Sequence, residues 1–360
     1  MVALLGPVRY AAPNAGVRAR LAQRLSANLW AQLLAAPNLD AVVALLGTTA
    51  YGATLAAVTG QTPEPEQVEQ ELRAYLIQAF RVPFKLMQGK PRPLLDWLWR
   101  RFELENVKTV MRSVASNRPP RDIRAALLPL GSGSELPWDA MIEAQSLPAL
   151  LPSLRTTFHG EQYARALEPA MDRYGREGKL FVLEVALDLA YYRRLLRLLD
   201  GLGGRDRRDA GRFVGTLIDG HNLLWAFRYR VYFDLSPEEI LNYTLQRRLR
   251  VDAAMVREIA LGASLPEATR EVWNDRLPDL ERLEERPPEE ALPDLELIVR
   301  RYLYIQAQRA LEGYPFHLGT ILAYTVLLES DVQDLIAIAE GKAAGWSAEQ
   351  IRPTLIGRRG

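Results

Sequence analysis

The chain has 360 residues, of which 48% are hydrophobic and 25% charged, and its formal net charge is +1. These values are ordinary for a soluble globular protein, and near-neutrality disfavours nucleic-acid binding, which needs a basic surface. Because cysteine is absent, disulfides, thiolate metal sites and a cysteine nucleophile are excluded.

The chain shows no signal for a membrane span or a secretory leader. No apolar run reaches the roughly 18 residues that a span needs. The segment from Met1 to Pro7 has too short an apolar run, and too early a proline, for a secretory signal. We therefore expect a cytosolic chain, and at about 150 residues per domain its length allows two to three domains.

Apolar residues recur at helical spacing almost everywhere, and no sustained period-2 alternation bounded by hairpin turns occurs. This pattern predicts an all-α fold. Near the start, leucines at every fourth position predict one helix over residues 21–35, ended by Pro37 and Asn38.

Two later helix starts have local sequence signals. Ser236, followed by Pro237 and Glu239, predicts a capping box. Gly345 predicts the end of the penultimate helix, and Ser347 with Gln350 predicts the start of the last one. Four further segments have the composition of exposed connectors, namely residues 61–66, 131–134, 201–208 and 286–290.

One short pattern occurs three times, as an acid followed three residues later by a second polar residue and then by an apolar one. The copies are Glu103-x-x-Asn106-Val107, Asp219-x-x-Asn222-Leu223 and Asp331-x-x-Asp334-Leu335, separated by 116 residues (103 to 219) and 112 residues (219 to 331). This spacing exceeds the roughly 20–50 residues of solenoid repeats, so each unit can be a small helical domain. With linkers at 117–120 and 233–237, we predict units at 14–120, 121–234 and 235–357.

Other positions follow the same repeat. Nine residues after each acid stand Arg112, Arg228 and Glu340, so the third copy has diverged. Stretches that begin with Glu184 and Glu296 contain tyrosines and precede their motif helix by roughly 35 residues, which indicates the same internal order of helices.

The repeated polar residues allow two interpretations. On a helix, the motif positions share one face with an apolar stripe, so the residues could form three carboxylate sites for a cation or a substrate. Alternatively, each polar side chain satisfies backbone groups of a neighbouring segment at a repeat junction, as buried polar groups require. We favour this structural role for Glu103, Asn106, Asp219, Asn222, Asp331 and Asp334. Arg112 and Arg228 are expected to face solvent or the adjacent unit.

Sequence signatures of catalysis are missing. There is no G-x-x-x-x-G-K-[ST] phosphate loop and no G-x-S-x-G elbow, although sequence order alone leaves a serine triad open. His159, His221 and His317 lie far apart, and none has another histidine at helical spacing for a metal. We predict no catalytic residue, no cofactor and no metal.

Together, these segments resemble a known family, the C subunit of bacterial and archaeal V/A-type rotary ATPases, called the d subunit in the eukaryotic vacuolar enzyme. The resemblance is carried by residues 314–342, with an A-Y-x-x-x-x-E run, and by the I-R-x-x-L pattern ending at Leu355. Residues 51–55 and 103–112 are similar to the family's first unit, and 219–228 to its second. Asp334, where the family usually has asparagine, and Glu340 depart from the pattern.

The resemblance implies three pseudo-symmetric helical units arranged as a funnel. Its mouth would receive the central shaft subunits D and F, and its base would rest on the membrane proteolipid rotor ring. The chain would then be a non-catalytic, torque-transmitting central-stalk subunit, peripheral on the cytoplasmic face of the membrane. Two alternatives stay open: a helical-repeat scaffold for another soluble partner, and a helical enzyme that uses carboxylates such as Asp219 and Asp331.

Overall fold

The computed structural model describes residues 5–58, 62–245, 250–274, 276–284 and 286–357. Within these ranges the chain forms α-helices joined by turns and short 3₁₀ segments, and no β-strand occurs. The predicted all-α class is confirmed. Among the described residues, no helix combines the length and the apolarity that crossing a bilayer requires.

Before Asn117 the helices are, in chain order, α1 (Leu5–Leu21), α2 (Ala27–Ala35), α3 (Leu39–Gly47), α4 (Gly52–Leu55), α5 (Pro65–Phe80) and α6 (Pro91–Ala115). Up to Phe233 they are α7 (Pro120–Ala126), α8 (Trp138–Ile142), α9 (Leu150–Leu154), α10 (Phe158–Glu177), α11 (Phe181–Asp200) and α12 (Gly204–Tyr232). Then follow α13 (Pro237–Asn242), α14 (Ala253–Ala260), α15 (Leu265–Trp273), α16 (Pro288–Ala310), α17 (Leu318–Ala343) and α18 (Ala348–Ile351).

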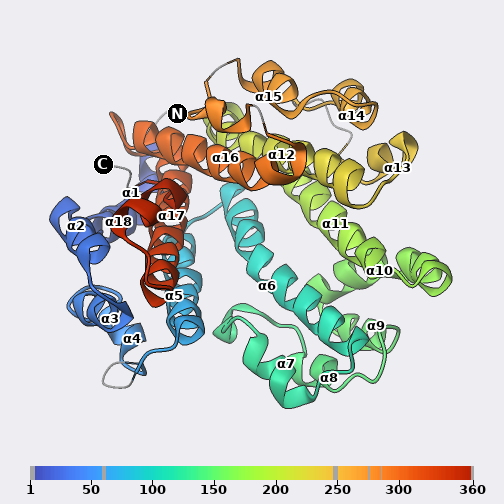
Figure 1. The fold of residues 1–360 in the computed structure, drawn as a ribbon, viewed down its shortest axis with the longest axis horizontal. Helices are drawn as coiled ribbons and strands as arrows, with labels where there is room; N and C mark the ends of the chain where they lie inside the picture. The colour runs from blue at the N-terminus through green and yellow to red at the C-terminus, as the bar shows by residue number, and fades with distance from the viewer. Residues whose placement is uncertain (1–4, 59–61, 246–249, 275, 285, 358–360) are drawn as a thin grey trace.

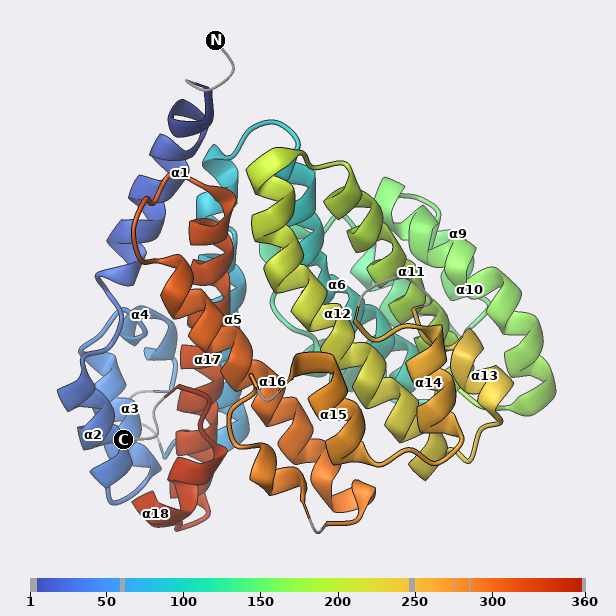
Figure 2. The same ribbon diagram turned by 90° about the horizontal axis from the view of Figure 1, so that it is seen from above.

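The chain runs once around the molecule and closes on itself, as the colours in Figure 1 show. Helix α6 packs on α11, and α12 packs on α16 and α14. Helix α17, near the C-terminus, packs on α16 and also on α5 and α1 from the N-terminal part, beside which it lies in Figure 2. The first and last parts of the chain therefore share one hydrophobic core.

The long helices are also joined by hydrogen bonds from buried aromatic side chains. The indole nitrogen of Trp97 on α6 donates to the carbonyl of Tyr191 on α11 over 2.9 Å. The hydroxyl of Tyr324 on α17 donates to the carbonyl of Ala79 on α5 over 3.1 Å. Since both contacts are buried, they are shielded from competition by water, and they fix how these helix pairs are placed.

The predicted helix boundaries at Ser236 and Ser347 are confirmed. Each serine begins a short helix with a complete capping box, closed by Glu239 in α13 and by Gln350 in α18. Gly345 follows α17 with a φ of 74°, a left-handed conformation that glycine adopts without steric cost.

The prediction of one helix over residues 21–35 is wrong. Helix α1 ends at Leu21, and α2 starts at Ala27 with Ser26 as its N-cap, whose hydroxyl accepts from the backbone of Leu29. Arg24 lies in this break and pairs with Asp331 on α17. The leucine spacing runs through the break unchanged, so the local pattern gave no sign of it.

The four predicted exposed connectors are also wrong in part. Helix α5 begins at Pro65 and α16 at Pro288, so the segments 61–66 and 286–290 end within helices, and residue 61 lies outside the described residues. Helix α12 begins at Gly204, so residues 205–208 are helical instead of forming a loop. In the segment 131–134, Gly133 is buried, and a Cβ at this position would lie 2.5 Å from the Trp99 ring. That glycine is required by close packing and not by an exposed turn.

Candidate functional site

The three copies of the repeated motif lie on three of the longest helices of the described part of the chain, α6, α12 and α17. Their polar side chains are buried, with exposed fractions between 0% and 3% at Glu103, Asn106, Asp219, Asn222, Asp331 and Asp334. The apolar residues on the same helix face, among them Val107, Leu223 and Leu335, are fully buried as well. Each polar group must therefore find its partner inside the protein.

The amides at the fourth motif position bind backbone. Asn106 donates to the carbonyl of Leu128 over 2.9 Å and accepts from its N–H over 2.8 Å. Asn222 makes the same pair of bonds with Leu245, at 3.0 and 2.9 Å. In each copy, the helix is thereby attached to a segment 22 or 23 residues further along the chain.

The third copy differs in chemistry and keeps the same spacing. The carboxylate of Asp334 accepts from the backbone N–H of Ile356 over 2.6 Å and from that of Gly357 over 3.0 Å. A carboxylate only accepts, so the segment presents two N–H groups where the other copies present an N–H and a carbonyl. The aspartate in place of asparagine is thus accompanied by a partner segment that offers only hydrogen-bond donors at this position.

The acids at the first motif position have three different environments. Glu103 accepts from Arg100 Nη1 at 2.9 Å to each oxygen, from the Ser134 hydroxyl at 2.6 Å and from the Tyr163 hydroxyl at 3.2 Å. Asp331 accepts two bonds from Arg24, from Nε at 2.6 Å and from Nη2 at 2.8 Å. In these two copies an arginine therefore neutralises the buried carboxylate.

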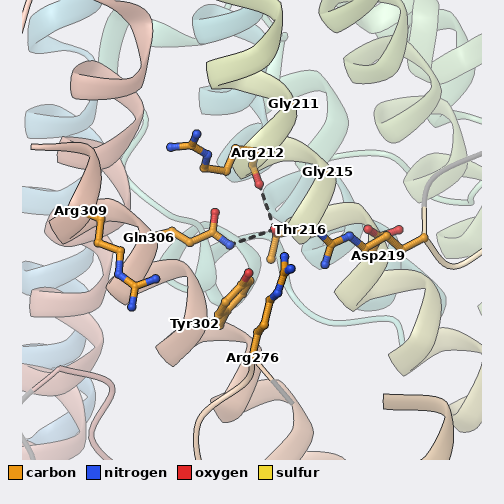
Figure 3. A pocket seen from close by; sticks show the side chains of 10 residues that line it. Gly211, Arg212, Gly215, Thr216, Asp219, Arg276, Tyr302, Gln306 and Arg309 are labelled. Carbon is orange, nitrogen blue, oxygen red and sulfur yellow. Dashed lines mark hydrogen bonds between the residues drawn. The ribbon is translucent and has the colours of Figure 1, made fainter. Parts of the chain in front are cut away.

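Asp219 is the exception. It accepts from the backbone N–H of Val251 over 3.1 Å, and within the described residues it forms no ion pair. Burial raises the pKa of Asp219 to about 6, although the Val251 hydrogen bond and the charge of Arg250 act in the opposite direction. Its side chain lines a cavity of about 660 Å³, shown in Figure 3.

The bases nine residues after the acid pair with the two stretches that share the repeat. Arg112 binds Glu184 over 2.6 Å, and Arg228 binds Glu296 over 3.1 Å. All four side chains are partly exposed. The first ion pair therefore joins α6 to α11 at the protein surface, and the second joins α12 to α16. Both arginines thus contact the unit that was predicted to follow their own.

In the third copy, Glu340 of α17 takes the place of the arginine. Burial and the nearby Glu69 raise the pKa of Glu340, and Arg73 on α5 lowers it. Arg73 itself pairs with Glu69 on the same helix over 2.6 Å, so Glu340 faces both charges of that pair. The ion pair that joins two helices in the first two copies is therefore not repeated at Glu340 within the described residues.

Few of the described histidine and acidic side chains are placed as a catalytic or metal site would need. Within the described residues no group of three histidine, aspartate or glutamate side chains converges as a metal site would need. Burial lowers the pKa of both His159 and His221 to about 4, so these imidazoles are neutral near pH 7. His317 lies 2.8 Å from Asp209 and apart from the motif residues.

Sequence reasoning missed the partners of the motif. Leu128, Leu245 and Ile356 stand at a nearly constant distance after the fourth motif position, and that spacing was the available signal. No sequence signal pointed to Arg24, Ser134 or Tyr163, because only the tertiary fold brings these residues into contact with the motif acids.

Residues 13–353 match the sequence model of the family described as ATP synthase (C/AC39) subunit. A relative named as the C subunit of an A-type ATP synthase, from Methanocaldococcus jannaschii, is 24% identical over 358 residues, which cover 99% of this chain and 88% of the relative. Proteins of the same name from Pyrococcus abyssi and Halobacterium salinarum are 25% and 28% identical, over 95% and 80% of this chain and 89% and 81% of their own lengths.

Proposed function

Because the chain belongs to the ATP synthase (C/AC39) subunit family, we propose that it is a non-catalytic central-stalk subunit of a V/A-type ATPase. In this role it joins the rotating shaft, subunits D and F, to the proteolipid ring of the membrane sector. Rotation of the shaft then turns the ring and moves ions, or the reverse during ATP synthesis. The chain lies on the cytoplasmic face of the membrane without entering it.

The observation that carries the proposal is the match over residues 13–353, because a single family model covers nearly the whole chain. The names of the relatives agree with it, since each is the C subunit of an A-type ATP synthase and aligns with most of this chain. The buried motif adds support, because apart from Asp219 its polar side chains bind backbone, arginine or hydroxyl groups of neighbouring segments.

Transmission of torque needs a stiff body, and the closed course of the chain favours stiffness. Close-packed interiors yield little under strain. In this protein α17 packs on α1 and α5, so the two ends of the chain are held together and do not form a hinge. The recurring attachment 22–23 residues after Asn106, Asn222 and Asp334 supports the three-unit arrangement that we propose.

Reconstitution tests the proposal. The complete ATPase is placed in vesicles with and without this chain, and both ATP hydrolysis and ATP-driven ion uptake are measured. Without the chain, hydrolysis by the catalytic head should continue while ion uptake falls to background, and adding the purified chain should restore uptake. Hydrolysis serves as the internal control. Ion uptake that does not change when the chain is absent would rule out the coupling role.

A further inference from the structure

A cavity of about 660 Å³ lies between α12 and α16. It is bounded further by Arg250, just before α14, and by Arg276, just after α15. Its size falls in the range of about 300–1,000 Å³ that is typical of small-molecule sites. The cavity beside the corresponding acid of the third copy, Asp331, measures only about 20 Å³, because Arg24 occupies that place.

Four arginines from four separate segments line this cavity, namely Arg212, Arg250, Arg276 and Arg309. None of them takes part in an ion pair with any residue in the described ranges, although Arg250 donates to the carbonyl of Val272 over 3.2 Å. Neighbouring arginines behave differently, since Arg301 pairs with Asp279 at 2.5 Å. Since Asp219 is the one acid in the described lining, the cavity gathers an excess of positive charge.

The neutral part of the lining also leaves a group unsatisfied. Gln306 on α16 is only 7% exposed, and its amide nitrogen donates to the hydroxyl of Thr216 over 3.3 Å. Its carbonyl oxygen, Oε1, is buried without a partner among the described residues. In Figure 3 the Gln306 side chain lies between Thr216 and the Arg309 side chain, with Arg212 nearby. A buried acceptor without a donor favours a ligand that brings a hydroxyl or amino group.

The backbone of α12 leaves room for that ligand. Gly211 and Gly215, one helical turn apart, both line the cavity, and a Cβ added at either would meet no atom within 4 Å. Their missing side chains let a ligand approach the helix closely. Tyr302 of α16 supplies an aromatic ring to the lining.

We propose that this cavity binds an organic anion with two or more phosphoryl groups, of the size of a nucleoside diphosphate. Guanidinium groups bind phosphate oxygens through paired, charge-assisted hydrogen bonds, and four of them match a multivalent anion better than a single carboxylate. Gln306 Oε1 and the Tyr302 ring provide a place for the organic part. Asp219 is the only acid among the described lining residues, and its single carboxyl is outnumbered by the four guanidinium groups. The inference goes beyond the proposed coupling function and does not depend on it.

Isothermal titration of the purified full-length chain tests the site, with pyrophosphate and adenosine diphosphate as probes in a phosphate-free, metal-free buffer. Both probes should bind saturably at one site per chain, and adenosine diphosphate should bind more tightly. Arg276→Glu and Arg309→Glu should each weaken binding at least tenfold. Arg193→Glu, which makes the same charge change at an exposed position on α11, should leave binding within twofold.

A further variant tests whether the ligand occupies the volume of the cavity, without changing the charge of its lining. Gly211→Leu should fill the cavity beside α12 and weaken binding at least tenfold, and an unchanged thermal melting curve would show that the fold is intact. The proposal fails if neither probe binds saturably, or if all three charge reversals weaken binding equally. It fails also if an acidic peptide displaces both probes at lower concentration, because the surface would then serve a protein partner.

Discussion

Arg24 and Asp331 are separated by 307 residues in the chain and form an ion pair with two hydrogen bonds, at 2.6 and 2.8 Å. The pair joins the break between α1 and α2 to the middle of α17, so it fastens the N-terminal helices to the last long helix. Asp331 is 2% exposed, and the Arg24 side chain 24%. The contact is therefore largely withdrawn from water, where ion pairs are sensitive to the loss of one partner.

We expect Asp331→Asn to lower the free energy of unfolding by about 1–3 kcal/mol, because Arg24 then keeps its charge without an anionic partner. Urea unfolding followed by circular dichroism measures the change. The exposed pair between Arg207 and Asp200 serves as the control, and Asp200→Asn should cost less than about 1 kcal/mol. If both variants lost the same free energy of unfolding, the ion pair between Arg24 and Asp331 would stabilise the protein no more than an exposed pair does.

Replacing the carboxylate of Asp219 should raise the stability of the protein at neutral pH instead of lowering it. Its pKa in the folded state is raised from 3.8 to about 6, so between these pH values the native state binds more protons than the unfolded state. The free energy of unfolding then falls as the pH rises through this window, and above it the full cost is about 3 kcal/mol. Asp219→Asn, whose amide oxygen can still accept from Val251, should stabilise the protein at pH 7.5 and have little effect near pH 4.

Unfolding in urea at pH 4, 5, 6 and 7.5, in phosphate-free buffer, gives the difference between the two proteins. The matched control is Asp252→Asn, because the exposed Asp252 caps α14 and asparagine caps a helix equally well. This control should change stability by less than about 0.5 kcal/mol at every pH. A difference for Asp219→Asn that stays constant with pH, or that grows as the pH falls, would contradict the prediction.

The sequence predicted those features whose signals lie within one or two helical turns. The capping boxes at Ser236 and Ser347 were predictable because serine and its partner three residues later are sufficient to form them. The buried face of the motif was predictable because helical geometry alone places its positions together. The family was also recognised correctly, from motifs whose order and spacing extend along the whole chain.

Features that depend on distant contacts were missed. The break after Leu21 could not be read from the leucine spacing, because Arg24 leaves the helix to reach a partner on α17. The open cavity beside Asp219 could not be distinguished from the closed surroundings of Glu103, since both acids stand in the same local pattern. What differs is whether an arginine reaches the carboxylate, and for Asp331 that arginine is 307 residues away.

The fourth motif position allows a comparison between copies. Asn106→Asp and Asn222→Asp each remove the donor to a backbone carbonyl, of Leu128 and of Leu245, and place a negative charge beside that oxygen. Each should cost about 1–3 kcal/mol. Asp334→Asn should cost less at neutral pH, because its remaining oxygen still accepts from one of the two N–H groups. The midpoints of urea unfolding give the order of stability of the three variants. If Asp334→Asn were the most destabilising of them, the interpretation that Asp334 is matched to two backbone N–H groups would be contradicted.

The ion pair between Arg112 and Glu184 gives the last prediction. Arg112→Glu places like charges opposite each other at Glu184, and because both groups are partly exposed, the cost should be only about 0.5–1 kcal/mol. Adding Glu184→Arg restores an ion pair with its two charges exchanged between the helices, so the double variant should recover most of the loss. A double-mutant cycle in urea measures the coupling energy between the two positions. If the double variant were as unstable as the two single changes added together, Arg112 and Glu184 would carry no coupling energy, and the prediction would be wrong.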